Sequence, residues 1–203
     1  MFAKIHNLMI LTTCAALTVA CDGVDETAQH ASDEHLVQVD DSLVVPAPRH
    51  CVVELQADAA EGADATPEMA CFSRFADAIF FATAEELPAD ATPDSYEPLP
   101  LADRPLSATF VIGVEYDAKS WSGGNGSITY TSTSTCDQKA QSVPVLSNTW
   151  QNRISSARAF SGCLHSYHYE SNYFSGAAVD CGAACSYIGD PLQNRTSSIR
   201  WTK

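Results

Sequence analysis

The sequence is poor in basic residues: 11 Lys and Arg stand against 25 Asp and Glu, a formal net charge of −14 over 203 residues. Proteins that bind a phosphate backbone carry a surplus of Lys and Arg, which argues against nucleic acid as a partner. The sequence also lacks a G-x-S-x-G motif, an H-E-x-x-H motif and a P-loop lysine. We therefore expect a protein that is not an enzyme.

Long apolar runs are absent after residue 20. The first 20 residues hold Lys4 and then a mostly apolar stretch, which is too short for a stable transmembrane helix of roughly 20 apolar residues. This pattern predicts a secretory signal peptide over 1–20. The junction that follows, Leu17-Thr18-Val19-Ala20-Cys21, resembles a bacterial lipobox, although Thr18 stands where that pattern prefers Leu. The resemblance implies a cell-envelope lipoprotein held to the membrane only by lipid on Cys21, and a secreted protein cut after Ala20 is the alternative.

Acidic residues are concentrated in the first half of the chain. Residues 1–107 contain 19 acids and 4 bases, whereas residues 108–203 contain 6 acids and 7 bases. With the distribution of proline, this break predicts an acidic tether over 21–48, a small strand-helix unit over 49–87, a Pro-rich linker over 88–107 and a separate domain over 108–203.

The unit over 49–87 combines two periodicities. Alternating side chains predict a short strand over Cys51–Leu55. Apolar residues recur every three or four positions between 72 and 83, which predicts an amphipathic helix from Ser73 to about Leu87 with Ser73 as its cap. We interpret the apolar stripe of this helix as core or partner contact.

The region from 108 onward is rich in Thr, Ser, Tyr, Val and Gly. Short alternating runs predict strands over 109–116, 127–133, 157–160 and 164–169. The fold class of this region is therefore all-β, a sandwich or a barrel.

Eight cysteines are present, of which Cys14 leaves with the signal peptide and Cys21 is assigned to lipid. An even set of six in an exported protein predicts disulfides before metal ligands. Six thiols allow 15 connectivities, but two of the cysteines precede the region boundary and four follow it. We propose the pairs Cys51–Cys71, Cys136–Cys163 and Cys181–Cys185; the alternative is a zinc site using the C-x3-C of the last pair.

Two elements of the sequence occur twice, in the same order. The first is an aromatic residue, four residues, an aromatic residue, any residue and Gly, at 116–123 and again at 169–176. The second is Gln-Asn-Arg-x-Ser-Ser, at 151–156 and 193–198. Physically, this predicts a folded hairpin whose two aromatics pack over a Gly-containing turn, which a later Ser holds by hydrogen bonds.

This double motif, Y-x4-[WF]-x-G followed by N-x-x-S-S, resembles the βγ-crystallin domain over residues 108–203. The ending Arg195–Trp201 is most similar to the secreted bacterial type grouped with the peptidase inhibitors of the Streptomyces metalloproteinase inhibitor family. The resemblance implies two Greek-key motifs forming a β-sandwich.

Calcium-binding members of that family carry [ND]-[ND]-x-x-[ST]-S, and two copies exchange ligands to build two sites. By resemblance, the candidate Ca²⁺ ligands are Asn152, the carbonyl of Arg153 and Ser155 in one copy, Asn194, the carbonyl of Arg195 and Ser197 in the other, and the turn residues Asp117 and Glu170. Gln151 and Gln193 stand in the first motif position and supply no charge, so we expect weak binding. The alternative is that the same Asn and Ser residues only stabilise turns.

Inhibition of secreted metalloproteases is the second reading of the resemblance. The candidate loop is Ser142–Thr149, which we interpret as an extra length in the first copy. The expected partner is thus a secreted protease or a cell-surface component, bound by a monomer. His165 and His168 are three apart on a predicted strand, so they lie on opposite faces and share no ligand.

Overall fold

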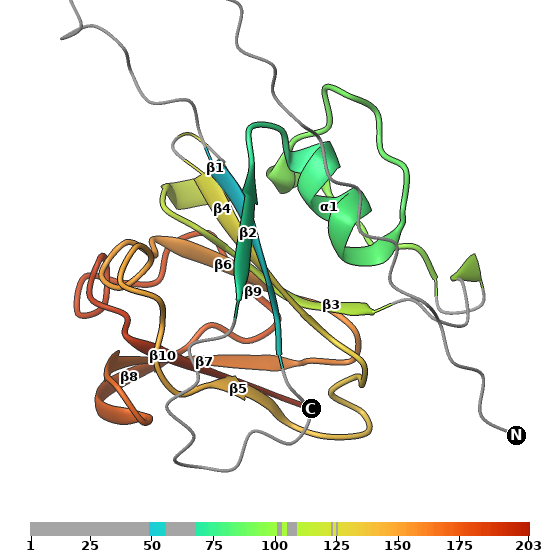
Figure 1. Cartoon of the computed structure of the whole chain (residues 1–203). Helices are drawn as coiled ribbons and strands as arrows, with labels where there is room; N and C mark the ends of the chain where they lie inside the picture. The colour runs from blue at the N-terminus through green and yellow to red at the C-terminus, as the bar shows by residue number, and fades with distance from the viewer. Residues whose placement is uncertain (1–48, 56–67, 101–102, 105–108, 123, 125) are drawn as a thin grey trace, which may run out of the picture. The chain divides into compact units, whose positions relative to one another are not determined.

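Two β-sheets with one hydrophobic core between them make up the fold (Figure 1). The computed structural model describes residues 49–55, 68–100, 103–104, 109–122, 124 and 126–203. The expected signal peptide, the lipid site at Cys21 and the acidic tether over 21–48 lie outside these residues. Where the chain is described, its regular secondary structure is mostly strand, with one α-helix, α1 (Phe75–Thr83), and none of its helices is long and apolar enough to span a bilayer.

The six-stranded sheet has the order β2-β1-β4-β3-β6-β9, and the four-stranded sheet has the order β5-β10-β7-β8. The first contains β2 (Met69–Phe72), β1 (Arg49–Glu54), β4 (Gly126–Ser132), β3 (Phe110–Tyr116), β6 (Ser156–Ala159) and β9 (Ala184–Cys185). The second contains β5 (Gln141–Val143), β10 (Ser198–Thr202), β7 (His165–Ser171) and β8 (Ser175–Asp180). The four strands expected after residue 108 are confirmed as β3, β4, β6 and β7, with nearly the expected boundaries.

From β3 onward, the two halves of the chain have matching strand orders. In the six-stranded sheet β4, β3 and β6 of the first half are followed by β9 of the second. In the four-stranded sheet β8, β7 and β10 of the second half are followed by β5 of the first. Each half therefore places its third strand in the sheet of the other, which ties the two halves together through backbone hydrogen bonds.

The main core lies between the sheets. It combines Ile128 and Tyr130 from β4 with Ile199 and Trp201 from β10, and all four are at most 1% exposed. The indole of Trp201 lies against β3, where a Cβ added to Gly113 would be 2.6 Å from its Nε1. Glycine at this position therefore allows the sheets to approach closely.

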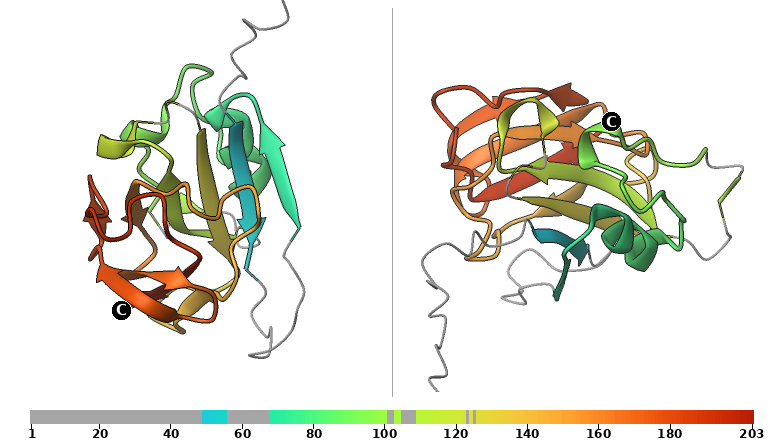
Figure 2. Two further views of the ribbon diagram at one scale, coloured as in Figure 1. Left: turned by 90° about the vertical axis from the view of Figure 1, so that its left-hand side faces the viewer. Right: turned by 90° about the horizontal axis from the view of Figure 1, so that it is seen from above.

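A second core covers the other face of the six-stranded sheet. Phe75 and Ile79 of α1 pack with Tyr96 against Val114 and Tyr116 of β3. Figure 2 shows α1 on the side of this sheet that faces away from the four-stranded sheet. Because both faces of the six-stranded sheet are buried, its central strands lack the alternation of a half-exposed strand.

The expected strand in the 49–87 unit is confirmed, and it pairs with the later region. β1 runs parallel to β4, with Cys51 opposite Ile128 and Val53 opposite Tyr130. Cys51 and Val53 of β1 also lie in the main core with residues of β4, β6 and β10, so the described part of the 49–87 unit shares a sheet and a core with the later region.

The linker expected over 88–107 is packed where the structure describes it around Tyr96. A 3-10 turn over Pro93–Ser95 brings Tyr96 against the sheet with 3% of its surface exposed. The hydroxyl of Tyr116 donates to the carbonyl of Pro93 at 2.9 Å, and the guanidinium of Arg158 donates to the carbonyl of Tyr96 at 2.8 Å. These bonds attach the segment to β3 and β6 rather than leaving it as a spacer.

The expected helix forms but is shorter than its sequence pattern. It begins after Arg74, which makes no capping hydrogen bond, so the prediction that Ser73 caps it is wrong. It ends because Ala84 takes a left-handed conformation with φ 59° and the hydroxyl of Thr83 accepts the N–H of Glu85 at 3.2 Å. Leu87 therefore lies beyond the helix, although it still packs against the second core.

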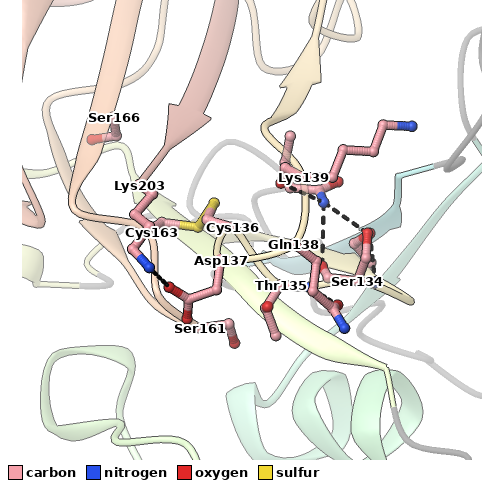
Figure 3. Close-up of a disulfide and its surroundings, with 12 residues drawn as sticks. Ser134, Thr135, Cys136, Asp137, Gln138, Lys139, Ser161, Cys163, Ser166 and Lys203 are labelled. Atoms are coloured by element: carbon pink, nitrogen blue, oxygen red, sulfur yellow. Dashed lines mark hydrogen bonds and ion pairs between the residues drawn. A yellow bond between two sulfur atoms is a disulfide. The ribbon is translucent and has the colours of Figure 1, made fainter.

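All three expected disulfides are present. Cys51 and Cys71 face each other across β1 and β2, and Cys181–Cys185 closes the turn before β9. Cys136–Cys163 links the loop before β5 to the start of β7, beside an ion pair at 2.8 Å between Lys203 and Asp137 (Figure 3). Cys51–Cys71 closes a loop of 20 residues and Cys136–Cys163 closes one of 27 residues. Each is worth about 3 kcal/mol in the chain-entropy model.

Candidate functional site

The two aromatic turns have the same backbone conformation. Ser120 and Trp121 have φ of 58° and 57°, and Tyr173 and Phe174 have φ of 56° and 59°. Two successive non-glycine residues in the left-handed region are unusual, and they need outside contacts to hold them. The pairs occupy equivalent positions in the two copies, so the repeat in sequence is also a repeat in structure.

One serine in each copy supplies those contacts. The hydroxyl of Ser156 donates to Ala118 O at 2.6 Å and accepts the N–H of Trp121 at 3.1 Å. The hydroxyl of Ser198 donates to Ser171 O at 2.7 Å and accepts the N–H of Phe174 at 3.0 Å. The prediction that a later serine holds each turn is therefore confirmed.

The two Asn-Arg-x-Ser-Ser elements lie side by side and bond to each other. The N–H of Asn152 donates to Thr196 O, and the N–H of Asn194 donates to Ile154 O, both at 3.0 Å. Both asparagines are left-handed, with φ of 59° and 54°. Asparagine tolerates this conformation better than most residues, which explains its use at both positions.

Three oxygen atoms meet where these elements cross the first aromatic turn. The hydroxyl of Ser155 lies 3.1 Å from Asp117 O and 3.1 Å from Asn194 Oδ1. Asn194 comes from the second copy, whereas Asp117 and Ser155 come from the first. The hydroxyl of Ser155 has one proton and cannot donate a full hydrogen bond to both acceptors. A cation can therefore bind among these three oxygens.

The nearby carboxylates are already paired with arginines. Arg153 Nη2 lies 3.0 Å from Asp117 Oδ2, and Arg195 forms the equivalent ion pair with Glu170. Asp117 therefore adds its backbone oxygen to the cluster while its side chain is neutralised by Arg153. Among the described residues, no group of three or more His, Cys, Asp or Glu side chains is arranged to hold a metal ion.

The backbone contacts of Ser155 and Ser197 are equivalent in the two copies. Their N–H groups donate to Tyr116 O and Tyr169 O, each at 2.8 Å, and their carbonyls accept the N–H groups of Ile188 and Leu146, each at 2.9 Å. The oxygen cluster described here is the one formed by the side chain of Ser155. The structure brings Asp117, Ser155 and Asn194 together out of the eight predicted ligands.

His165 and His168 point to opposite faces of β7, as their spacing predicts. His165 is partly exposed and bonds Asp180 Oδ2 through Nδ1 at 2.8 Å. His168 is fully buried, and its Nε2 lies 2.9 Å from Oε2 of the equally buried Glu115. Glu115 and His168 each directly precede the first aromatic residue of a repeat, Tyr116 or Tyr169, so this pair joins equivalent positions of β3 and β7. Our sequence reasoning missed it, although the shared position was a usable signal.

A second buried histidine was also missed. His50 Nδ1 lies 2.9 Å from the hydroxyl of Ser127, and the ring packs edge-on against Phe75. Burial lowers the pKa of His50 below its ordinary value of 6.5, and the charge of Asp117 opposes this shift. Ser127 is 0% exposed, so this pair cannot reach a substrate and is a structural contact.

The segment 142–149, our candidate inhibitory loop, is not an extra length. Leu146 is buried in the main core nine residues before Ser155, as Ile188 is nine residues before Ser197. The N–H groups of Leu146 and Ile188 donate to the carbonyls of Ser197 and Ser155, each at 2.9 Å. The additional residues of the first copy instead include 133–140, before β5, in the loop held by Cys136.

Comparison of the chain with protein-family models, with curated proteins and with solved structures finds no match.

Proposed function

We propose that the two halves of residues 108–203 are Greek-key motifs of a βγ-crystallin-like β-sandwich, and that the protein is an exported binding protein without enzymatic activity. Three observations support this proposal. The halves have matching strand orders, they exchange β5 and β9, and each holds its left-handed aromatic turn with an equivalent serine. The features most strongly shared by the halves are those of the double sequence motif.

The ligand that this geometry favours is Ca²⁺, bound weakly around Ser155. One observation carries the proposal: the hydroxyl of Ser155 lies 3.1 Å from the amide oxygen of Asn194 and 3.1 Å from the backbone carbonyl oxygen of Asp117. These are hard oxygen ligands of the kind that Ca²⁺ takes, but none is charged. Gln151, in the first motif position, donates to Leu146 O at 3.1 Å and to Asn172 Oδ1 at 3.3 Å, so its side chain is directed elsewhere.

Calorimetry and thermal unfolding of the whole protein in millimolar CaCl₂ test this site. A ligand that binds only the folded state raises the stability by RT ln(1 + [L]/Kd), so the melting temperature should rise with Ca²⁺ concentration. Ser155→Ala and Asn194→Ala should abolish the rise, whereas Ser175→Ala, at an exposed serine at the start of β8, should keep it. No heat and an unchanged melting temperature for the wild-type protein would reject the calcium site.

Export and lipid attachment are a separate part of the proposal. They rest on the signal-like residues 1–20 and on Cys21. Labelling cells with a radioactive fatty acid, followed by N-terminal sequencing, reports both cleavage and acylation. An unlabelled mature protein would indicate that the protein is secreted without a lipid anchor.

Inhibition of a secreted metalloprotease is the second candidate function. One observation favours it: residues 137–140 are exposed on a loop fixed at one end by Cys136–Cys163 and at the other by β5. A preorganised loop loses little entropy on binding a protease. Titration against thermolysin tests it, and full protease activity at micromolar protein would rule it out.

A further inference from the structure

The outer face of the four-stranded sheet carries aromatic side chains in a line along β7. His165, Tyr167 and Tyr169 alternate with the buried Ser166 and His168, so the three rings lie on the face away from the core. All three are partly exposed. The outer face of the six-stranded sheet differs, because the chain itself covers it with α1 and Tyr96.

Ring contacts hold this line in place. The rings of His165 and Tyr167 stack at 5.8 Å between centroids with 15° between their planes. The ring of Tyr169 meets Phe174, from the aromatic turn, edge to face at 5.7 Å, and the guanidinium of Arg200 lies 5.5 Å from the centre of Phe174. The line is thus a set of side chains that are ordered before any ligand arrives, which lowers the entropy lost on binding.

Polar side chains flank the rings in a row across the sheet. The strand register places Ser142 of β5, Arg200 of β10, Tyr167 of β7 and Asp180 of β8 in adjacent positions. Ser142, Arg200 and Asp180 are exposed, and Tyr167 is partly exposed. The row holds one guanidinium and one carboxylate, so its charges balance, and it offers both donors and acceptors beside the rings.

We propose that this face, defined by His165, Tyr167, Tyr169, Arg200 and Asp180, binds an uncharged, extended polysaccharide chain. The C–H faces of sugar rings pack on aromatic rings, and their hydroxyl groups bond to mixed donors and acceptors of this kind. A β-linked chain is a flat ribbon, which fits a straight line of rings on a sheet. Sheet faces and their flanking loops bind oligosaccharides in other β folds.

The charge distribution decides against the main competing ligand. Single-stranded nucleic acid also stacks on aromatic rings, but its binding sites are positively charged grooves. Here the positive charge of Arg200 is balanced by the negative charge of Asp180, and residues 108–203 contain 6 acids and 7 bases, so this region carries no large positive charge. The proposal goes beyond calcium binding and does not depend on it, since none of its residues belongs to the oxygen cluster around Ser155.

Binding is tested with the whole protein and four probes: insoluble cellulose and chitin in sedimentation assays, and cellohexaose and chitohexaose in calorimetry. We expect binding to at least one of these glycans in the absence of Ca²⁺. Tyr167→Ala and Tyr169→Ala should each weaken it about tenfold, the loss of one well-placed ring contact. Tyr187→Ala is the matched control, because that phenol bonds Asp190 and its ring lies under Lys119, away from β7.

Melting temperatures of the variants show whether they fold. Should either tyrosine variant unfold, Arg200→Ala and Asp180→Asn test the same face at exposed positions, and each should weaken binding while Tyr187→Ala does not. The proposal is overturned when the wild-type protein binds none of the four glycans, or when folded variants of this face bind as tightly as the wild type. Binding of oligoproline in place of the glycans would also overturn it.

Discussion

Replacing His168 by Leu removes the partner of a carboxylate that has no contact with water. Glu115 and His168 are both 0% exposed, and they join the two sheets through one contact of 2.9 Å. Among the described residues, Glu115 Oε1 and His168 Nδ1 have no hydrogen-bond partner of their own. Glu115 also faces Tyr130, whose pKa burial raises well above its ordinary value, with the charge of Glu115 adding to that shift. In the described part of the chain, Glu115 therefore has no second hydrogen-bond partner that could replace the lost imidazole.

The size of the effect follows from that isolation. Removing one member of a buried pair costs about 3–5 kcal/mol, a large part of the 5–15 kcal/mol by which a domain is typically stable. The reverse change, Glu115→Leu, leaves the imidazole of His168 without its partner and should cost less, about 1–3 kcal/mol for an unsatisfied buried polar group. The double variant removes both polar groups, so it should be more stable than the His168→Leu protein.

Urea unfolding of the oxidised protein, extrapolated linearly to water, measures the four free energies of this double-mutant cycle. His165→Ala on the same strand is the control, because its pair with Asp180 is exposed and should contribute at most about 1 kcal/mol. Additive losses in the double variant, or a cost for His168→Leu no larger than for His165→Ala, would refute the reasoning.

Three further changes test other parts of the fold. Ser156→Ala and Ser198→Ala should each cost about 1–3 kcal/mol in urea unfolding, since each removes two hydrogen bonds at a buried serine. The control Ser175→Ala, at an exposed position, should change the free energy of unfolding by no more than about 0.5 kcal/mol. Equal losses in all three variants would contradict the role of Ser156 and Ser198 in holding the aromatic turns. Because burial depresses the pKa of folded His50, the unfolded chain binds a proton more readily, so this histidine's contribution to stability is complete above pH 6.5 and is lost as pH falls through and below that value. His50→Gln should remove that part of the pH dependence of the melting temperature. If the pH dependence is unchanged in this variant, another group causes it. Gly126→Ala should lower the melting temperature, because φ is 140° there and the added Cβ would meet the backbone oxygen of Arg49 in β1; an unaltered melting temperature would show that β1 can shift without loss.

Local features of the chain were readable from the sequence because their causes are local. Short runs of strand-forming residues located β3, β4, β6 and β7, and the spacing of aromatics, glycine and serine identified two turns with the same conformation. Cysteine number and position led to the three disulfides. Helix length was overestimated because apolar spacing continues past Ala84, where the left-handed backbone ends α1.

Periodicity shows that a residue is buried but does not name the surface that buries it. The parallel pairing of β1 with β4 and the packing of Tyr96 on β3 join segments that differ sharply in charge, and composition therefore placed them in separate units. The same limit applies to the candidate sites. Sequence supplied the types of ligand around Ser155, but the contact with Asn194 exists because two left-handed asparagines bring the copies together.

The amino-acid sequence by itself determined the strands β1, β3, β4, β6 and β7, the repeated turns and the disulfide partners, since each depends on neighbouring residues or on a short list of thiols. Only the tertiary structure decided that β5 and β9 exchange sheets, that Glu115 meets His168 in the core, and that the rings of β7 face outward beside Arg200 and Asp180. The physical reason is that these contacts join residues far apart in the chain, and their geometry is fixed only when both sheets close on one core.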